Sequence, residues 1–275
     1  GKGGYRGIEA LGVLKADVDD LGYLMSCGIE ERRFTISRLA TLSRQLNLFF
    51  TLHLPYLLQT DEKNGFNEIY TVFAGGDDLF LIGPWNSVIR LAGVLRERFA
   101  EYVCSNPVIH FSAGISLHKP HIPIRRLAES AEASLEKSKA NRDVKTGREK
   151  DSVTVFSETM FWDEFARIIE LGEKIEDWIE KGWVNNAMLY RLNEFIRMSG
   201  KEKHIRERGE ATLNAVDCIK WRALLGYSAE RNVGKDLSAE QREDAIREFS
   251  RSAGWLEEYG SRFKVALWHV LYNHR

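Results

Sequence analysis

The amino-acid sequence predicts an α+β fold, in which a βαββαβ domain precedes an all-α helical bundle. Three observations carry this prediction. Apolar β-type segments alternate with segments of helical period over residues 1–158, which favours one mixed domain. A Gly-Gly-Asp-Asp turn at residues 75–78 joins two β-type segments, as in a hairpin. Residues 159–275 show only amphipathic helical patterns. We therefore expect two domains, 1–158 and 159–275.

The bulk composition is that of an ordered globular protein. The chain has 275 residues, 44% of them hydrophobic, and a net charge of −1, so it can bury a core and has no global basic field for nucleic acid. Three scattered cysteines form no CxxC pair, which excludes a zinc ribbon and fits a reducing cytoplasm. The most apolar run, residues 46–58, is too short to span a membrane.

The beginning of the chain predicts a loop followed by a strand. Residues 1–7 contain four glycines and read as a linker, so the chain is expected to be a later part of a longer protein. Residues 8–17 are apolar and end at Asp17, which predicts a central strand. A helix is predicted over residues 32–58, with Pro55 ending or kinking it.

The middle of the first domain contributes the hairpin and a second βα pair. Strands are predicted over residues 68–74 and 79–82, on either side of the Gly-Gly-Asp-Asp turn. A helix follows the break at residues 83–86 and runs to about residue 103. A strand over residues 108–117 comes next.

The first domain closes with one helix and one strand. Pro123 suits the first position of a helix that is predicted to end at residue 138. A short last strand is predicted over residues 153–156. The first six elements therefore have the order β-α-β-β-α-β, which is that of the ferredoxin-like arrangement.

This order brings carboxylates together. In a ferredoxin-like sheet the first strand lies beside the central hairpin, so Asp17 can meet Asp77 and Asp78. The alternative is an ordinary solvated turn, since Gly and Asp are common there. Three carboxylates at one sheet edge favour hard divalent cations, most simply two Mg²⁺ ions. Two ions about 4 Å apart are typical of in-line phosphoryl transfer.

Two neighbouring segments suit phosphate. The backbone N–H groups of residues 19–22 follow a strand end, a position that favours phosphate oxygens; alternatively, Asp19 or Asp20 caps a turn or helix. Lys137 and Lys139 end the helix that begins at Pro123 and are within reach of a triphosphate. The alternative is that both lysines only complement the helix dipole.

The second half predicts amphipathic helices. They are expected over residues 161–180, 186–198, 210–225 and 241–272, with breaks at Gly182, Gly200, Gly226 and Gly234. The tryptophans are expected in the core. Mixed-charge runs at 201–208 and 222–231 favour solvated faces. The scattered histidines have no partners at zinc-ligand spacing, so no zinc site is expected.

Several motifs together resemble the Palm domain of nucleotidyl cyclases and polymerases. They are the strand ending in Asp17, the Gly-Gly-Asp-Asp hairpin, and an A-x-x-x-L-x-x-x-K helix at Ala131, Leu135 and Lys139. Diguanylate cyclases have a GGDEF or GGEEF hairpin instead, and no Arg-x-x-Asp inhibitory motif precedes this hairpin. The GGDD form, with KADVDDLG and LSRQLNLFF, is closer to the large subunit of type III CRISPR–Cas effector complexes, in the type III-A (Csm) branch.

The resemblance implies an enzyme, a nucleotidyltransferase that makes cyclic oligoadenylates from ATP with two Mg²⁺ or Mn²⁺ ions. By analogy, Asp17, Asp77 and Asp78 are catalytic, and they bind the metal ions together with the Val18 carbonyl. Ser43 would contact adenine, although an exposed helix serine is an equal alternative. The implied nucleotide-binding residues are Val18, Asp19, Asp20, Leu21, Gly22, Ser43, Gly75, Gly76, Lys137 and Lys139.

The resemblance also implies partners. These are a first Palm domain, the small helical subunit, and guide and target RNA reached through the complex. The first Palm, an HD nuclease and a zinc-binding region are not visible in this sequence, so the chain is expected to bind ATP and metal but to synthesise poorly alone. Two alternatives remain: a diguanylate-cyclase-like enzyme that uses GTP, and a non-catalytic Palm scaffold that docks RNA-bound partners.

Overall fold

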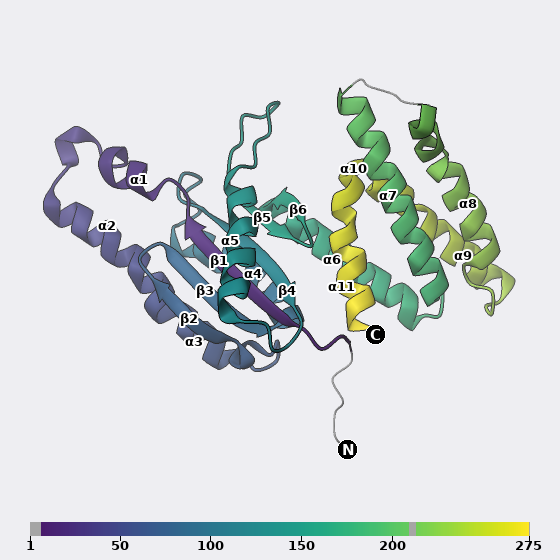
Figure 1. Ribbon diagram of the computed structural model, residues 1–275, viewed down its shortest axis with the longest axis horizontal. Helices are drawn as coiled ribbons and strands as arrows, with labels where there is room; N and C mark the ends of the chain where they lie inside the picture. Colours follow the sequence, from purple (N-terminus) through teal and green to yellow (C-terminus); the bar gives the residue numbers. More distant parts are fainter. Residues whose placement is uncertain (1–6, 209–212, 275) are drawn as a thin grey trace, which may run out of the picture. The chain divides into compact units, whose positions relative to one another are not determined.

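The fold is taken from a computed structural model, which describes residues 7–208 and 213–274. The described chain divides into two compact units. One holds residues 9–166 and contains the whole sheet; the other holds residues 7–8 and 167–274 and is helical (Figure 1). The predicted α+β class, with a mixed domain before an all-α region, is confirmed.

The first unit is built on a mixed sheet of six strands in the order β2-β3-β1-β4-β5-β6. β1 is antiparallel to β3 and to β4, and β5 is parallel to β4. The first strand thus lies beside the hairpin strand β3, as the ferredoxin-like order predicts. The strands are β1 Leu11–Val18, β2 Tyr70–Gly75, β3 Asp78–Pro84, β4 Phe111–His118, β5 Ser152–Val155 and β6 Glu158–Phe161.

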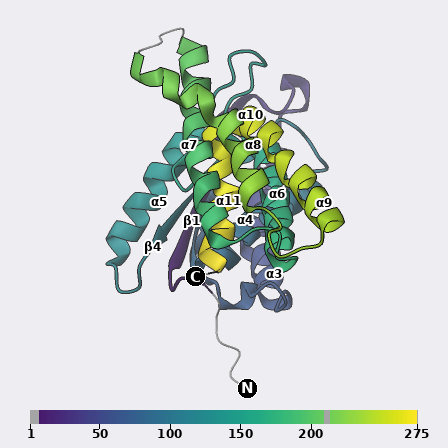
Figure 2. The ribbon, with the colours of Figure 1, turned by 90° about the vertical axis from the view of Figure 1, so that its right-hand side faces the viewer.

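Helices lie on both faces of this sheet. Figure 2 shows α4 on one side of β1 and α5 on the other. Two strand glycines permit this close packing: a Cβ on Gly12 would lie 2.7 Å from the backbone of α4, and one on Gly114 would lie 2.2 Å from the backbone of α5. The helices of this unit are α1 Leu21–Cys27, α2 Ile36–Leu48, α3 Leu54–Thr60, α4 Trp85–Tyr102 and α5 Ile124–Lys139.

The core on the α4 face is aromatic and aliphatic. Leu14 of β1 and Leu79 and Leu81 of β3 are fully buried there. Phe99 of α4 contacts Phe111 of β4 edge-to-face, with ring centroids 5.3 Å apart. Because successive side chains of a strand point to opposite faces, the residues of β1 and β3 that alternate with these leucines lie on the α5 face. Asp17 and Asp78 are among them. This alternation sets where the carboxylates point.

Several predicted boundaries in the first unit differ from the structure. Residues 21–27 form the short helix α1, so the alternative interpretation of a helix beginning after Asp20 is the correct one for this segment. The predicted helix over residues 32–58 begins only at Ile36 and becomes a π-helix over Phe49–His53 before α3. Pro55 lacks the N–H that an α-helix would pair with residue 51, which accounts for the break in regular helix there.

β1, β2 and β4 begin two or three residues later than predicted, β3 and β5 begin one residue earlier, and one strand was missed. β2 begins at Tyr70, after a 3₁₀ turn, and β4 begins at Phe111. β6 was missed because its turn carries no glycine signal: Phe156 and Ser157 both adopt positive φ, at 51° and 67°. Such a two-residue turn normally favours Asn-Gly or Gly-Gly.

The second unit is a set of packed helices. α7 packs against α8 and against α11, and Figure 1 shows it between the two. The helices are α6 Trp162–Glu180, which begins in the first unit, then α7 Asn186–Arg208, α8 Trp221–Asn232, α9 Ala239–Ser250, α10 Ser252–Tyr259 and α11 Lys264–Asn273. 3₁₀ segments cover Leu213–Lys220 and Gly260–Phe263.

Two predicted breaks were wrong. Gly200 lies inside α7 and Gly226 inside α8. A Cβ on Gly200 would lie 2.9 Å from the Ser261 side chain and 3.1 Å from its backbone nitrogen, so this glycine serves close packing rather than a break. The single helix predicted over residues 241–272 is three helices, with Gly260 at φ 56° between the last two.

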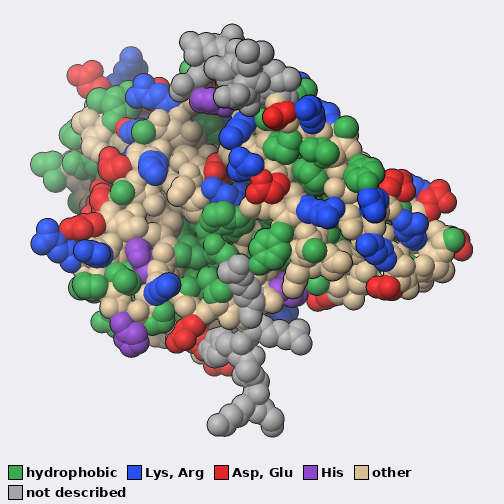
Figure 3. Space-filling model, turned by 45° about the vertical axis from the view of Figure 1, so that its right-hand side comes forward, with side chains coloured by type: hydrophobic (Ala, Val, Ile, Leu, Met, Phe, Trp, Pro, Cys, Tyr) green, Lys and Arg blue, Asp and Glu red, His purple; other side chains and the backbone are tan. Residues whose placement is uncertain are grey.

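Two predicted segments lie partly outside the residues that the structure describes. The helix predicted over residues 210–225 lies partly outside the described residues, and its described part is 3₁₀ before α8. Residues 1–6 of the predicted linker also lie outside them. In the described residues no helix is long and apolar enough to cross a membrane. On the face shown in Figure 3, basic and acidic side chains are interspersed.

Candidate functional site

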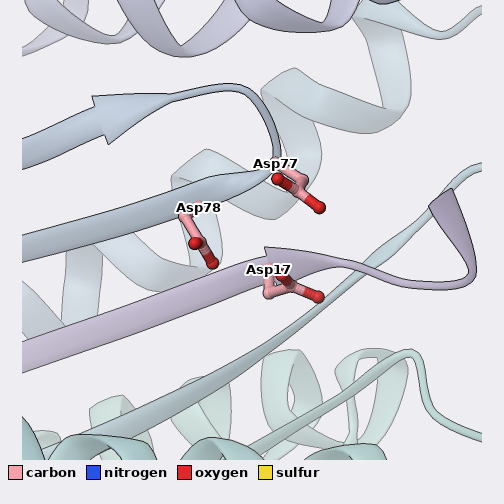
Figure 4. A group of neighbouring side chains, drawn as sticks. All are labelled: Asp17, Asp77 and Asp78. Carbon is pink, nitrogen blue, oxygen red and sulfur yellow. The ribbon is translucent and has the colours of Figure 1, made fainter. Parts of the chain in front are cut away.

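Three aspartates meet at one edge of the sheet. Asp17 lies opposite Asp78 in the β1–β3 register, and Asp77 lies in the turn between β2 and β3 (Figure 4). One carboxylate oxygen from each lies within 4.8 Å of the others. Within the described residues, this is the only group of three or more His, Cys, Asp or Glu side chains close enough to hold one ion.

One lysine partly offsets the negative charge of this cluster. Lys139, the last residue of α5, places Nζ 2.6 Å from Asp17 Oδ2. The pKa of Asp17 is raised to about 6: burial contributes most, the ion pair with Lys139 opposes it, and a hydrogen bond with Asp78 and the charge of Asp77 add to it. Burial lowers the pKa of Lys139, but the hydrogen bond and charge of Asp17 hold it above its ordinary value. Lys139 therefore stays charged.

The turn that carries Asp77 is fixed from two sides. Gly76 adopts φ 64°, which glycine tolerates without strain. Its N–H donates to Asn47 Oδ1 of α2 over 2.9 Å. The N–H of Val18 donates to the Asp77 carbonyl oxygen over 3.2 Å. The turn is thus tied to both α2 and β1.

Asp19 anchors the segment that follows β1. Its carboxylate is fully buried, and Oδ2 accepts hydrogen bonds from His110 Nδ1 at 2.8 Å, Ser112 Oγ at 2.9 Å and the Asp151 N–H at 3.1 Å. The cap that the sequence offered as an alternative is not formed by this side chain. The partners lie 91 to 132 positions away, so no local signal could have shown them.

Asp20 and Lys150 form a second contact at the same edge. Asp20 occupies the N-cap position of α1 with φ 52° but makes no capping hydrogen bond. Lys150 Nζ lies 2.5 Å from Asp20 Oδ1. Lys150 also adopts positive φ, at 57°; such left-handed residues are uncommon and concentrate at functional sites. Sequence reasoning missed Lys150. Leu21 and Gly22 are the first residues of α1.

The structure does not bring every predicted residue to the carboxylates. Lys137 is exposed, and two helical positions separate it by about 200° from Lys139. Ser43 is exposed on α2, one helical turn before Asn47. Gly75 lies directly opposite Asp78 in the hairpin. The roles assigned to Ser43 and Gly75 stay predictions, and the position of Lys137 on the helix does not favour a contact with a nucleotide at the carboxylates.

The residues present fit a hard divalent cation. All three side chains are carboxylates, the donors that Mg²⁺ and Mn²⁺ prefer. They crowd together with a single lysine as counter-charge, and close carboxylates repel one another unless a cation lies between them. The donor set therefore suits one or more such ions at this edge.

Comparison with known proteins identifies relatives. Residues 10–154 match the family Cas10/Cmr2, second palm domain. The chain is 38% identical over 169 residues to the CRISPR system single-strand-specific deoxyribonuclease Cas10/Csm1 (subtype III-A) of Methanocaldococcus jannaschii, covering 57% of this chain and 21% of that protein. It is 35% identical over 199 residues to the protein of the same name from Enterococcus italicus, covering 70% and 24%.

The fold also matches solved structures. A crystal structure of a Csm1-Csm4 cassette in complex with pppApApA aligns with a TM-score of 0.67 and 21% identity, covering 98% of this chain and 37% of that chain. At this identity the likeness shows the fold. The chain spans about a fifth to a quarter of the length of these two curated relatives. Because the family match covers more than half of the chain, this protein belongs to the Cas10 family, as a second palm domain with helical region from a subtype III-A large subunit.

Proposed function

We propose that this chain binds ATP with divalent metal ions and supplies one half of a site that forms cyclic oligoadenylates in type III CRISPR defence. The observation that carries the proposal is the approach of the Asp17, Asp77 and Asp78 carboxylates within 4.8 Å of one another. Solved Csm1-Csm4 cassettes include complexes with AMPPNP, ATP, pppApApA and cA4, which supports an ATP-derived chemistry for this family.

The proposed reaction joins two ATP molecules. The 3′-oxygen of one ATP forms a bond to the α-phosphorus of the other, the bond from that phosphorus to the bridging oxygen breaks, and pyrophosphate leaves with the electron pair. The 3′-hydroxyl gives its proton to water. Mg²⁺ or Mn²⁺ held by the three aspartates and the Val18 carbonyl would lower the pKa of the hydroxyl and neutralise charge on the phosphates.

The chain's own residues would orient the nucleotide. The N–H of Asp19 donates to the His110 carbonyl oxygen over 2.9 Å, so it is not available to a phosphate. Lys139 and the backbone of residues 20–22 are proposed to hold the triphosphate, with Lys150 as a further cation beside Asp20. Asp19 is proposed to keep this segment in place through its bonds to His110, Ser112 and the Asp151 N–H. Ser43 is proposed to contact adenine from α2.

Partners follow from the same proposal. The solved relatives contain Csm1 bound to Csm4, and we propose that the longer protein containing this chain binds a Csm4-like subunit. A first Palm domain, the small helical subunit, and guide and target RNA are further proposed partners. A first Palm would supply the second half of the nucleotide site.

The function is tested by product formation. The chain, alone and with a first Palm domain added, is incubated with ATP or GTP and Mg²⁺ or Mn²⁺, and products are identified by mass spectrometry. We expect ATP binding by the chain alone and oligoadenylates chiefly when the first Palm is present. A product made only from GTP would overturn the adenylate assignment. If the chain binds no nucleotide, the alternative of a non-catalytic Palm scaffold is the one that remains.

The two lysines of α5 give a matched pair of variants. Lys139→Ala is expected to weaken binding of ATP with Mg²⁺ by about 10- to 100-fold, since a hydrogen bond to a charged group contributes about 1.5–3 kcal/mol. Lys137→Ala, on the other side of the helix, is expected to change it less than about twofold. Equilibrium titration of both variants measures this. Equal losses in the two would mean that general charge, rather than position, matters.

A further inference from the structure

One part of the sheet face that carries the carboxylates is uncovered. In the β1–β3 register Asp17 is opposite Asp78, and Lys15 is opposite Phe80. Directly opposed strand residues share a face, so Phe80 lies on the same face as both aspartates. α5 packs on this face through Leu127 and Ala131, against Val13 of β1, with Phe80 and Ile82 at the margin of that contact.

A β-bulge in the edge strand adds two more aromatic side chains to this face. Tyr70 is opposite Ile82 and Phe73 is opposite Phe80, with a register shift between residues 71 and 73. Simple alternation would place residues 70 and 73 on opposite faces. The extra residue in the bulge places both on one face, and bulges often re-aim a side chain beside an active site.

These aromatic side chains remain accessible. Tyr70 is 69% exposed and Phe73 is 53% exposed, while Phe80 is half-buried between Phe73 and α5. Exposed aromatics on an edge strand favour association, which proteins usually prevent with charges or prolines. β2 has neither a charged residue nor a proline along its length. We call Tyr70, Phe73 and Phe80 the aromatic strip.

The strip is continuous with the carboxylates. Along β3, Phe80 is two residues from Asp78, which is about 7 Å at the usual rise of a strand. If the phosphates of a nucleotide lie at the aspartates, its base would therefore lie within reach of the aromatic strip. Tyr70 lies further along the same line.

We propose that the aromatic strip is a stacking platform for the bases of the bound nucleotide and of the growing oligoadenylate. Phe73 and Phe80 would receive the base nearest the carboxylates, and Tyr70 the next one. A four-stranded sheet of this topology presents aromatic side chains to stacked bases in RNA-recognition domains. Base–aromatic stacking is tolerant of base identity, so the strip would add affinity without selecting adenine.

This inference rests on the proposed function, and three probes separate the two. Inorganic tripolyphosphate, ATP and pppApA, each with Mg²⁺, are titrated into the 275-residue chain and its variants. Phe73→Ala is expected to weaken the binding of ATP and pppApA by about 5- to 100-fold, the range of stacking losses per base. The affinity for tripolyphosphate is expected to stay unchanged. Tyr70→Ala is expected to weaken pppApA more than ATP. Phe73→Trp is expected to retain binding of both.

Tyr56→Ala is the matched control, because this α3 aromatic is 68% exposed and is not in the strip. Circular dichroism verifies that each variant is folded. If Phe73→Ala leaves the affinity for both nucleotides unchanged, or weakens the binding of tripolyphosphate by the same factor, the proposed stacking role is wrong. Loss of self-association or of binding to a first Palm domain, with nucleotide binding intact, would assign the strip to a protein interface instead. If the unaltered chain binds neither tripolyphosphate nor ATP, the proposed function itself fails.

Discussion

Replacing Asp77 and Asp78 together by asparagine is expected to abolish metal-dependent oligoadenylate formation and to reduce metal affinity by more than about 100-fold. That factor is the upper end of losses for residues that only support metal ligands, and these side chains are proposed to be ligands themselves. Asparagine keeps the size of aspartate but removes its charge. Product formation, with the first Palm domain present, and Mn²⁺ binding by the chain both measure the effect.

The same double variant is expected to be at least as stable as the unaltered chain in the absence of metal. Asp78 is exposed, and burial together with the neighbouring Asp78 and Asp77 raises the pKa of Asp17 to about 6, so the charged cluster opposes folding. Removing two of its charges relieves repulsion. Asp236→Asn, at an exposed position in the second unit, is the control and is expected to change neither property. Full activity of the double variant would contradict the proposed site.

Replacing Glu202 by alanine is expected to destabilise the helical unit by about 3 kcal/mol or more, the usual cost of removing one partner of a buried ion pair. Glu202 of α7 is almost fully buried. Its Oε2 accepts hydrogen bonds from Trp221 Nε1 at 2.6 Å and Arg222 Nη1 at 2.7 Å, and Oε1 accepts one from Arg206 at 2.6 Å. Alanine would leave the indole N–H of buried Trp221 without this acceptor and would remove the link between α7 and α8.

Hydrogen exchange of α7 and α8 peptides, followed by mass spectrometry, measures this loss locally. Glu257→Ala is the matched control, because Glu257 pairs with Arg222 at 2.5 Å but its side chain is 52% exposed, and exposed pairs contribute at most about 1 kcal/mol. Similar exchange in the Glu202→Ala variant and the unaltered chain would show that the network does not hold these helices together.

The pH dependence of stability has a definite sign. Burial raises the pKa of Glu202, but the hydrogen bonds from Trp221 and Arg222 and the charges of Arg222 and Arg206 outweigh it, so the pKa lies below its ordinary 4.5. The unfolded chain then binds more protons around pH 4.5 than the folded one, so this contribution is present above pH 4.5 and is lost as the pH falls through the folded pKa. Glu202→Gln is expected to flatten that acid-side loss.

The part of the site predicted from sequence is the part set by strand order. Asp17 ends an apolar segment and the Gly-Gly-Asp-Asp turn separates two others, so placing β1 beside β3 was enough to bring the carboxylates together. Lys137 and Lys139 were both predicted as phosphate contacts from their place at the end of α5, and the structure pairs Lys139 with Asp17. These predictions needed only element order and the ends of elements, which hydrophobic periodicity and turn residues indicate well.

The missed features depend on contacts between distant segments. His110 and Lys150 reach Asp19 and Asp20 across 91 and 130 positions, and no local pattern encodes such a pairing. Gly200 was read as a break because glycine is a poor helix former, although its lack of a Cβ is what lets Ser261 approach α7. Helix propensity alone predicts that a glycine ends the helix, whereas close packing can require a glycine inside it. The two cases are distinguished only when the neighbouring segment is known.

The ion pair between Lys139 and Asp17 would couple the two proposed ligands, a metal cation and a phosphate. Asp17 Oδ2 is 2.6 Å from the lysine Nζ, so a cation that binds this oxygen competes with the ammonium group and releases it. The released ammonium is then free to attract an anion, and an anion that draws it away leaves Asp17 ready for a cation. Such coupling is reciprocal in free energy. A cation and a phosphate would each bind weakly alone and would strengthen one another when both are present.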